Sequence, residues 1–135
     1  MFRLANAKSN LLIEVGVQVL MSMNVKENGN QIRKFYQLGL EREMINMLAM
    51  TWTVVHPIDG NSPLQGLAEK DFIESEPEFL VFVNAINDTN SQPIHARTSY
   101  KRDEIVWGAK FASIYKTRKK KTIVRIDKIS EFTRL

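Results

Sequence analysis

The sequence predicts an all-β fold, an immunoglobulin-like β-sandwich of about seven to nine strands with one or two short helical turns. Three observations predict this class. Several segments alternate apolar and polar side chains with a period of two, turn signals separate these segments, and no long amphipathic helix is present. The 135 residues suit a single domain, 1–135, and 44% hydrophobic with 25% charged residues is the composition of a soluble globular domain.

The clearest strand is Leu11–Met21, with the sequence LLIEVGVQVLM. Its odd-numbered positions are all apolar, so we expect Leu11, Ile13 and the odd positions after them to share one buried face. The even-numbered positions are mixed and include one carboxylate, Glu14. On periodicity alone, a charge at such a position is most simply a solvated residue of the outer face.

The other strands of the first half follow from turn signals and apolar runs. Phe2–Leu4 is a short apolar segment ahead of the long strand. Asn28-Gly29 predicts a hairpin that leads into a strand at Gln31–Leu40. Asn46–Val55 is apolar on both faces, which predicts a central strand that is buried on both sides.

A turn-rich stretch then separates this strand from the next two. Two prolines and a glycine in His56–Leu64 end the strand. Ser62-Pro63 resembles a helix start, and Leu67–Phe72 is a candidate for another helical turn. Strands follow at Glu78–Ala85 and Gln92–Tyr100, joined by a polar turn.

The C-terminal part contains one more predicted strand and a hairpin. The strand is Glu104–Phe111, and the hairpin pairs Ser113–Lys116 with Thr122–Ile126. Its tip, Lys116–Lys121, holds much of the basic excess behind the net charge of +4. Such a run can contact nucleic acid or anionic lipid, but a solvated tip is the simpler interpretation. No aromatic residues interleave with the run, so no nucleic-acid partner is expected.

The residue types that enzymes use are sparse in this chain. There is no cysteine, which excludes disulfides and thiolate chemistry. His56 and His95 are the only histidines, and neither stands in a catalytic or metal-ligand spacing. Each is expected to form a structural hydrogen bond. We therefore expect no enzyme, no cofactor and no metal site. No apolar stretch approaches the roughly 20 residues that span a bilayer.

Three stretches together resemble one protein family. They are His56-Pro57-Ile58-Asp59 with Ser62-Pro63-Leu64, then Ala96–Tyr100, then Glu104–Gly108 with Phe111 after it. In this order and spacing they are similar to the cytoplasmic C-terminal domain of inward-rectifier potassium channels, closest to the prokaryotic members. The resemblance covers nearly the whole chain.

The resemblance implies an assembly and a function. It implies a homotetramer at the cytoplasmic face of the cell membrane, attached to a transmembrane pore domain that is absent from this sequence. Four copies would extend the K⁺ pathway into the cytoplasm and couple ligand or lipid signals to the gate. The alternative from a different class is a monomeric immunoglobulin-like module that binds a protein partner through a sheet face or edge.

The resemblance also implies candidate site residues. Glu14 matches a pore-facing acid that attracts cations, including the blockers Mg²⁺ and polyamines. Asn84 stands where a second pore acid can occur and is neutral here, which implies weaker block. Glu41 and Glu43 are candidates for the same acidic vestibule. Lys8 lies near a basic position linked to lipid control, so an anionic phospholipid is an expected partner.

A polar segment matches the narrowest cytoplasmic constriction of the family. Its candidate residues are Ala85, Ile86, Asn87, Asp88, Thr89, Asn90 and Ser91. Of these, Ile86 and Ser91 are expected to face the axis of the channel. The simpler interpretation of the segment is an ordinary hairpin turn. Arg97 is expected to be structural and to pair with a carboxylate of its own or a neighbouring subunit.

Overall fold

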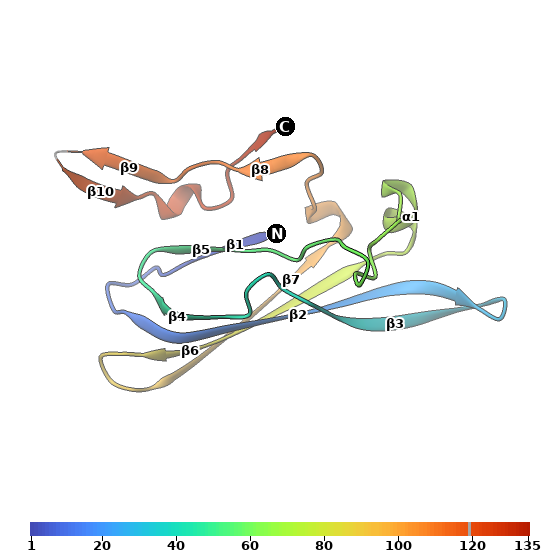
Figure 1. The fold of residues 1–135 in the computed structure, drawn as a ribbon, viewed down its shortest axis with the longest axis horizontal. Helices are drawn as coiled ribbons and strands as arrows, with labels where there is room; N and C mark the ends of the chain where they lie inside the picture. The colour runs from blue at the N-terminus through green and yellow to red at the C-terminus, as the bar shows by residue number, and fades with distance from the viewer. Residues whose placement is uncertain (119) are drawn as a thin grey trace.

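Four long antiparallel strands form the principal sheet of the molecule (Figure 1). The computed structural model describes residues 1–118 and 120–135. The long strands lie in the order β3-β2-β6-β7, and a short strand, β4, also pairs with β2. The bounds of these strands are β2 (Leu12–Glu27), β3 (Asn30–Leu38), β4 (Met44–Leu48), β6 (Glu78–Asn87) and β7 (Pro93–Lys101).

A two-stranded ribbon lies over one face of this sheet (Figure 1). It consists of β1 (Phe2–Ala5) and β5 (Thr51–Val54), which pair antiparallel. Phe2, Leu4, Trp52 and Val54 of the ribbon pack against the buried side chains of the principal sheet. These contacts bury the apolar face of both layers, which is the arrangement of a β-sandwich.

The C-terminal segment adds a further layer on the other side of the ribbon (Figure 1). Arg3 of β1 connects the two, because its guanidinium donates hydrogen bonds to the carbonyls of Ala112, Lys128 and Ile129 at 2.5–3.1 Å. The strands of this layer form two antiparallel pairs, β8 (Ala109–Phe111) with β11 (Phe132–Arg134) and β9 (Tyr115–Arg118) with β10 (Lys121–Val124).

Strand β2 supplies the centre of the core. Val15, Val17, Val19 and Met21 are each at most 4% exposed. Side chains of alternate residues point to the same face of a strand, so these four form one continuous apolar row. The predicted all-β sandwich is confirmed, as are the buried row and the hairpin from β2 to β3. The described residues contain eleven strands instead of the predicted seven to nine, because several of them are only three or four residues long.

For the residues of β2 before residue 15, the prediction of which side chains point into the core is wrong. The pairing of β2 with β6 shifts by one residue between Ile13 and Gly16, which marks a β-bulge. An extra residue in a strand exchanges its two faces. Leu12 therefore packs with Val15 and Leu48 in a second core cluster, where the sequence pattern placed Ile13.

The predicted central strand at Asn46–Val55 is also wrong. The segment is two strands, β4 and β5, with a bend at residues 49 and 50, and each strand belongs to a different sheet. Both faces are apolar because the segment contributes to two clusters, with Leu48 buried in one and Val54 in the other. Met47 is 59% exposed and Met50 is 43% exposed, so the segment is not buried on both sides.

The predicted strand at Glu104–Phe111 is reduced to β8. It begins with a 3₁₀ turn, η1 (Arg102–Glu104), and only its last three residues pair. Its apolar pattern comes from packing, since Trp107 contacts Phe72 edge-on at 5.3 Å between ring centroids. Phe72 belongs to the one α-helix among the described residues, α1 (Glu69–Glu74), and a second 3₁₀ turn, η2, spans Ile126–Lys128. In the part of the chain that the structure describes, no helix has the length and apolar character needed to span a membrane.

Candidate functional site

The bulge in β2 determines how Glu14 is presented. Ile13 pairs with Ile86 and Gly16 with Asn84, so Glu14 and Val15 together face only Ala85. Val15 is fully buried, whereas Glu14 is exposed and has a φ of 49°. That left-handed backbone is uncommon for a residue with a Cβ atom. The bulge therefore points an apolar side chain inward and leaves the adjacent carboxylate in water.

Asn84 and His95 form a polar pair beside the bulge. They are direct partners across β6 and β7, and His95 Nδ1 lies 2.7 Å from Asn84 Oδ1. Both residues are exposed. The partner of Asn84 on the other side is Gly16, which has no side chain to cover the pair. The structure thus brings Glu14, Asn84 and His95 to one end of the principal sheet.

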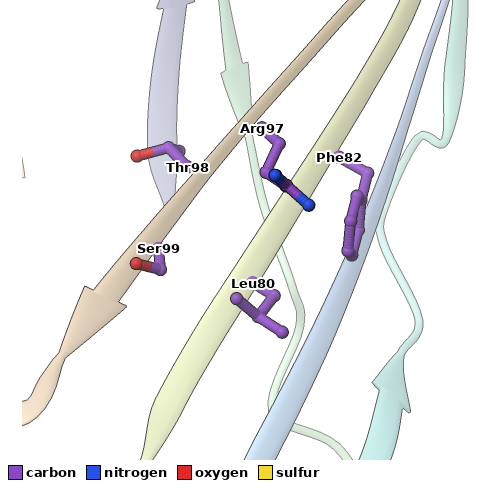
Figure 2. Close-up of a pocket in the computed structure, with 5 residues that line it drawn as sticks. All are labelled: Leu80, Phe82, Arg97, Thr98 and Ser99. Carbon is purple, nitrogen blue, oxygen red and sulfur yellow. The ribbon is translucent and has the colours of Figure 1, made fainter.

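A shallow hollow lies further along the same two strands (Figure 2). It has a volume of about 330 Å³ and is lined by Leu80 and Phe82 of β6 and by Arg97, Thr98 and Ser99 of β7. Arg97 and Phe82 are direct partners in the sheet, and the Arg97 side chain extends toward the Phe82 ring. Among the described residues of this chain, no carboxylate forms an ion pair with Arg97.

The acidic connection before β4 approaches this region through its backbone. Glu43 and Glu41 are both exposed. The carbonyl of Glu43 accepts a hydrogen bond from the Val17 amide at 2.9 Å, next to the bulge. The Glu41 amide instead donates to Val55 at the end of β5. The structure therefore places Glu43 near the β2 bulge, and it places Glu41 toward the two-stranded ribbon.

The predicted constriction segment needs a correction. Its first three residues, 85–87, belong to strand β6, and the turn itself comprises only the residues that follow. Ala85 is 5% exposed and belongs to the second core cluster, so it is not part of a loop surface. The turn is held by Asn87, whose carbonyl accepts from the Ser91 amide at 2.8 Å and whose side chain accepts from Thr89.

A backbone hydrogen bond joins this turn to the segment before β2. The Asp88 amide donates to the Leu11 carbonyl at 3.0 Å. Lys8 lies in the loop just before Leu11, and its amide donates to the Asn6 side chain at 3.1 Å. The Asn6 side chain also donates to the Asn10 carbonyl, which closes the loop. The loop that carries Lys8 and the turn that carries Ser91 are thus directly connected.

The expectation for His56 is confirmed. Its Nδ1 lies 2.5 Å from the Gly39 carbonyl and its Nε2 lies 2.7 Å from the Ser62 hydroxyl. These bonds fix the loop after β5 to the end of β3. The expectation for His95 is confirmed as a hydrogen bond, but its partner was not foreseen. That partner could have been found from the hairpin register, since residues 84 and 95 are equally far from the turn.

Two pKa shifts occur away from this surface. The Arg125 side chain donates a hydrogen bond to Asp127 and thereby lowers the pKa of the Asp127 carboxyl. Burial of the Met1 amino group lowers its pKa, because the charged form loses hydration. Within residues 1–118 and 120–135, no group of three acidic or histidine side chains could hold a metal ion.

The exposed Glu14, Asn84 and His95 side chains lie on an open sheet surface. Comparison with known proteins specifies the class. The family model described as "Inward rectifier potassium channel C-terminal domain" matches residues 1–134. The chain therefore belongs to the family of inward-rectifier potassium channel C-terminal domains. This is a family of non-enzymatic ion-channel domains, so the expectation of no enzyme is confirmed by membership.

Individual relatives refine this assignment. The chain is 36% identical over 118 residues to the inward rectifier potassium channel Kirbac3.1 of Paramagnetospirillum magnetotacticum, covering 87% of this chain and 40% of that protein. It is 30% identical to the ATP-sensitive inward rectifier potassium channel 15 of Mus musculus and 27% identical to channel 8 of Homo sapiens. Those alignments cover 83% and 84% of this chain, and 31% and 28% of the relatives.

These similarities confirm the family resemblance found from the sequence. The chain is a cytoplasmic domain of prokaryotic type from a membrane channel. It spans less than half the length of each of these relatives.

Proposed function

We propose that this chain is the regulatory and pore-extending domain of a homotetrameric K⁺ channel, in which four copies surround an aqueous pathway below a transmembrane pore domain. The observation that carries the proposal is the exposed carboxylate of Glu14, held at a β-bulge at the end of the principal sheet. One such carboxylate is a solvated charge. Four copies around an axis form a ring, so the function depends on symmetry.

The electrostatic effect of such a ring can be estimated. A monovalent cation about 7 Å from each of four carboxylates gains about 0.6 kcal/mol from each in water, or about 2.4 kcal/mol in total. Screening at physiological salt, with a Debye length of about 8 Å, reduces this to about 1 kcal/mol. That free energy concentrates K⁺ about fivefold. Mg²⁺ and polyamines gain in proportion to their charge, so they would act as blockers.

The neutral side chain of Asn84 limits this attraction. It lies on the same end of the sheet as Glu14 and adds no negative charge there. Glu43 is the better supported of the two additional acids, because its backbone is bonded to β2 beside the bulge. We therefore propose a ring dominated by Glu14, with Glu43 contributing and with block by multivalent cations that is moderate in strength.

The gating function would use the bond between Leu11 and Asp88. We propose that Lys8 contacts an anionic phospholipid at the membrane surface and that the turn at residues 88–91 narrows the cytoplasmic pathway. The Lys8 loop is closed by Asn6 and ends at Leu11, which accepts the amide of Asp88. A displacement of the loop by lipid would therefore move the turn. This supports coupling between lipid binding and the width of the pathway.

The test of the proposal is Glu14→Gln in the complete channel, measured as Mg²⁺ and polyamine block in planar bilayers at low salt. We expect block to weaken several-fold, because the ring loses its charge while Gln keeps the size and shape of the side chain. Salt should reduce the difference between variant and wild type.

Glu76→Gln is the matched control. Glu76 is also exposed and also has a left-handed backbone, with a φ of 48°. It lies just before the start of β6, at the opposite end from Asn84 and the bulge. We expect wild-type block from this variant. Equal block in the Glu14→Gln and wild-type channels would count against the proposal and favour the monomeric binding module.

A further inference from the structure

We propose that a cavity between the layers of this domain binds a long-chain carboxylic acid, with the hydrocarbon chain inside the cavity and the carboxylate at Lys110. The cavity has a volume of about 710 Å³, which falls in the range of small-molecule binding sites. Its lining contains none of the residues proposed above for the ion pathway or the lipid loop. The inference therefore goes beyond the proposed function and does not rest on it.

Apolar side chains from several elements form the walls of the cavity. Val19 of β2 and Val81 of β6, which are direct partners in the principal sheet, both belong to the lining. The β1–β5 ribbon contributes Phe2 and Val54, and the C-terminal layer contributes Ile129. Walls on several sides enclose a small molecule, whereas the surface of a protein partner is too broad to enter between them.

Five aromatic rings line the cavity and contact one another. Phe72 of α1 lies 6.1 Å from Phe79 of β6 and 5.3 Å from Trp107, measured between ring centroids. Phe2 lies 6.4 Å from Tyr100 of β7 in the same way. Trp107 is 39% exposed, so the cavity is open to solvent beside this ring. A hydrocarbon chain placed against these rings would remove apolar surface from water, which favours binding.

Three polar side chains of the lining already have hydrogen-bond partners within the chain. The Arg3 guanidinium donates to three backbone carbonyls of the C-terminal layer, and both ring nitrogens of His56 are bonded. A carboxylate oxygen of Glu104 accepts from the Lys101 amide at 2.8 Å. These bonds reduce what water could gain inside the cavity, and apolar cavities that hold water poorly take up apolar molecules.

Lys110 supplies the charge that selects a carboxylate. It is exposed, stands between Ala109 and Phe111 on β8, and belongs to the lining. In the part of the chain that the structure describes, no carboxylate forms an ion pair with Lys110. The lining holds the basic side chains of Arg3 and Lys110 against the single acid Glu104, so its net charge is positive. A ligand with an apolar chain and one anionic group therefore matches both the walls and the charge.

The experiment titrates the purified chain with laurate, below the concentration at which laurate forms micelles, and with dodecanol, which has the same hydrocarbon chain and no charge. Tryptophan fluorescence reports binding, because Trp107 lines the cavity and Trp52 is the only other tryptophan. We expect saturable binding of both molecules. Laurate should bind about two- to fivefold more tightly than dodecanol, the range that an exposed ion pair supplies.

Three variants locate the site. Lys110→Gln should bind laurate and dodecanol equally. Lys26→Gln, the matched control, removes an exposed lysine outside the cavity and should keep the preference for laurate. Ala109→Phe fills part of the cavity, so it should weaken the binding of both molecules about tenfold or more. If Ala109→Phe does not fold, the comparison of Lys110→Gln with Lys26→Gln decides, because both lysines are exposed.

The absence of saturable binding overturns the inference. Wild-type affinity for both molecules in folded Ala109→Phe does the same, because binding would then lie on the outer surface. An unchanged preference for laurate in Lys110→Gln, or an equal loss of it in Lys26→Gln, contradicts the assignment of the carboxylate to Lys110. None of these measurements involves ion flow, so their failure is distinct from a failure of the Glu14→Gln test of the proposed function.

Discussion

At the scale of single residues, Glu14 combines an unfavourable backbone with an exposed charge. A left-handed backbone conformation raises the free energy of a residue with a Cβ atom by about 1 to 2 kcal/mol above that of an ordinary conformation. Glycine does not carry this cost. The bulge is retained because Val15 and Leu12 on either side of it fill the second core cluster. The packing of Val15 and Leu12 therefore keeps the Glu14 carboxylate at the surface.

This backbone predicts how substitutions at Glu14 affect stability. We expect Glu14→Val to lower the free energy of unfolding by about 1 to 2 kcal/mol, since a β-branched side chain is strained at positive φ. Glu14→Gly should be neutral or slightly stabilising. Urea unfolding followed by circular dichroism measures both. Gln18→Val is the control, because Gln18 is exposed on the same strand without a positive φ. A loss of stability in the control equal to that in Glu14→Val would contradict the prediction.

The exposure of Glu14 and the structural hydrogen bonds of His56 were predicted from the sequence, but the contact between Asn84 and His95 was not. The first two depend on local features, namely a charge within an apolar alternation and a histidine before a proline in a turn. The third depends on register, which is fixed only when the turn at residues 88–90 is placed. The positions of Glu41 and Glu43 were likewise undetermined, since they depend on which strand each backbone amide or carbonyl meets.

At the scale of elements, the sequence predicted strands well where one face is buried and poorly where a segment serves two layers. β2, β3, β6 and β7 alternate clearly and were located to within a few residues, apart from the later end of β2. Residues 46–55 have two apolar faces because the chain crosses from one sheet to another. A period of two cannot distinguish that crossing from a strand buried on both sides.

Arg3 is the residue that joins the ribbon to the C-terminal layer. Its guanidinium donates to three backbone carbonyls and lies 4.6 Å from the centre of the Phe111 ring. Hydrogen bonds to a charged donor contribute more than neutral ones, and carbonyls left without a partner in a half-buried site carry a desolvation cost. Arg3 therefore ties β1 to the backbone beside β8 and β11 and to the Phe111 ring of β8.

Replacing Arg3 should loosen the C-terminal layer selectively. We expect Arg3→Met to lower the free energy of unfolding by about 2 to 4 kcal/mol. Hydrogen exchange should show lost protection in residues 109–111 and 132–134, with β2 and β6 unchanged. Arg134→Met is the control, because Arg134 is exposed and lies 5.8 Å from the Phe132 ring. Equal loss of protection in β2 and β6 would show that Arg3 supports the whole fold instead.

At the scale of the whole molecule, the proposed ion-pathway surface and the proposed lipid loop meet at one end of the principal sheet. The loop at residues 6–10 leads into β2, and the turn at residues 88–90 joins β6 to β7. Because β2 and β6 are neighbours in the sheet, a single backbone hydrogen bond from Asp88 to Leu11 links the turn to the end of the loop. Family resemblance implied both sites, but this connection is a property of the folded sheet.

This connection predicts that lipid binding and its effect on opening can be separated in the complete channel. Lys8→Gln removes a charge that contributes about 1 kcal/mol near an anionic surface, so more anionic phospholipid should be needed for half-maximal opening, with the maximum unchanged. Asp88→Pro removes the amide that donates to Leu11, so the lipid requirement should stay while the maximal opening falls. Single-channel recordings over a series of anionic lipid fractions measure both quantities.

Lys26→Gln, which removes an exposed charge near the tip of the β2–β3 hairpin, is the control for Lys8 and should behave as wild type. Identical lipid curves for Asp88→Pro and wild type would mean that the signal does not travel through this bond.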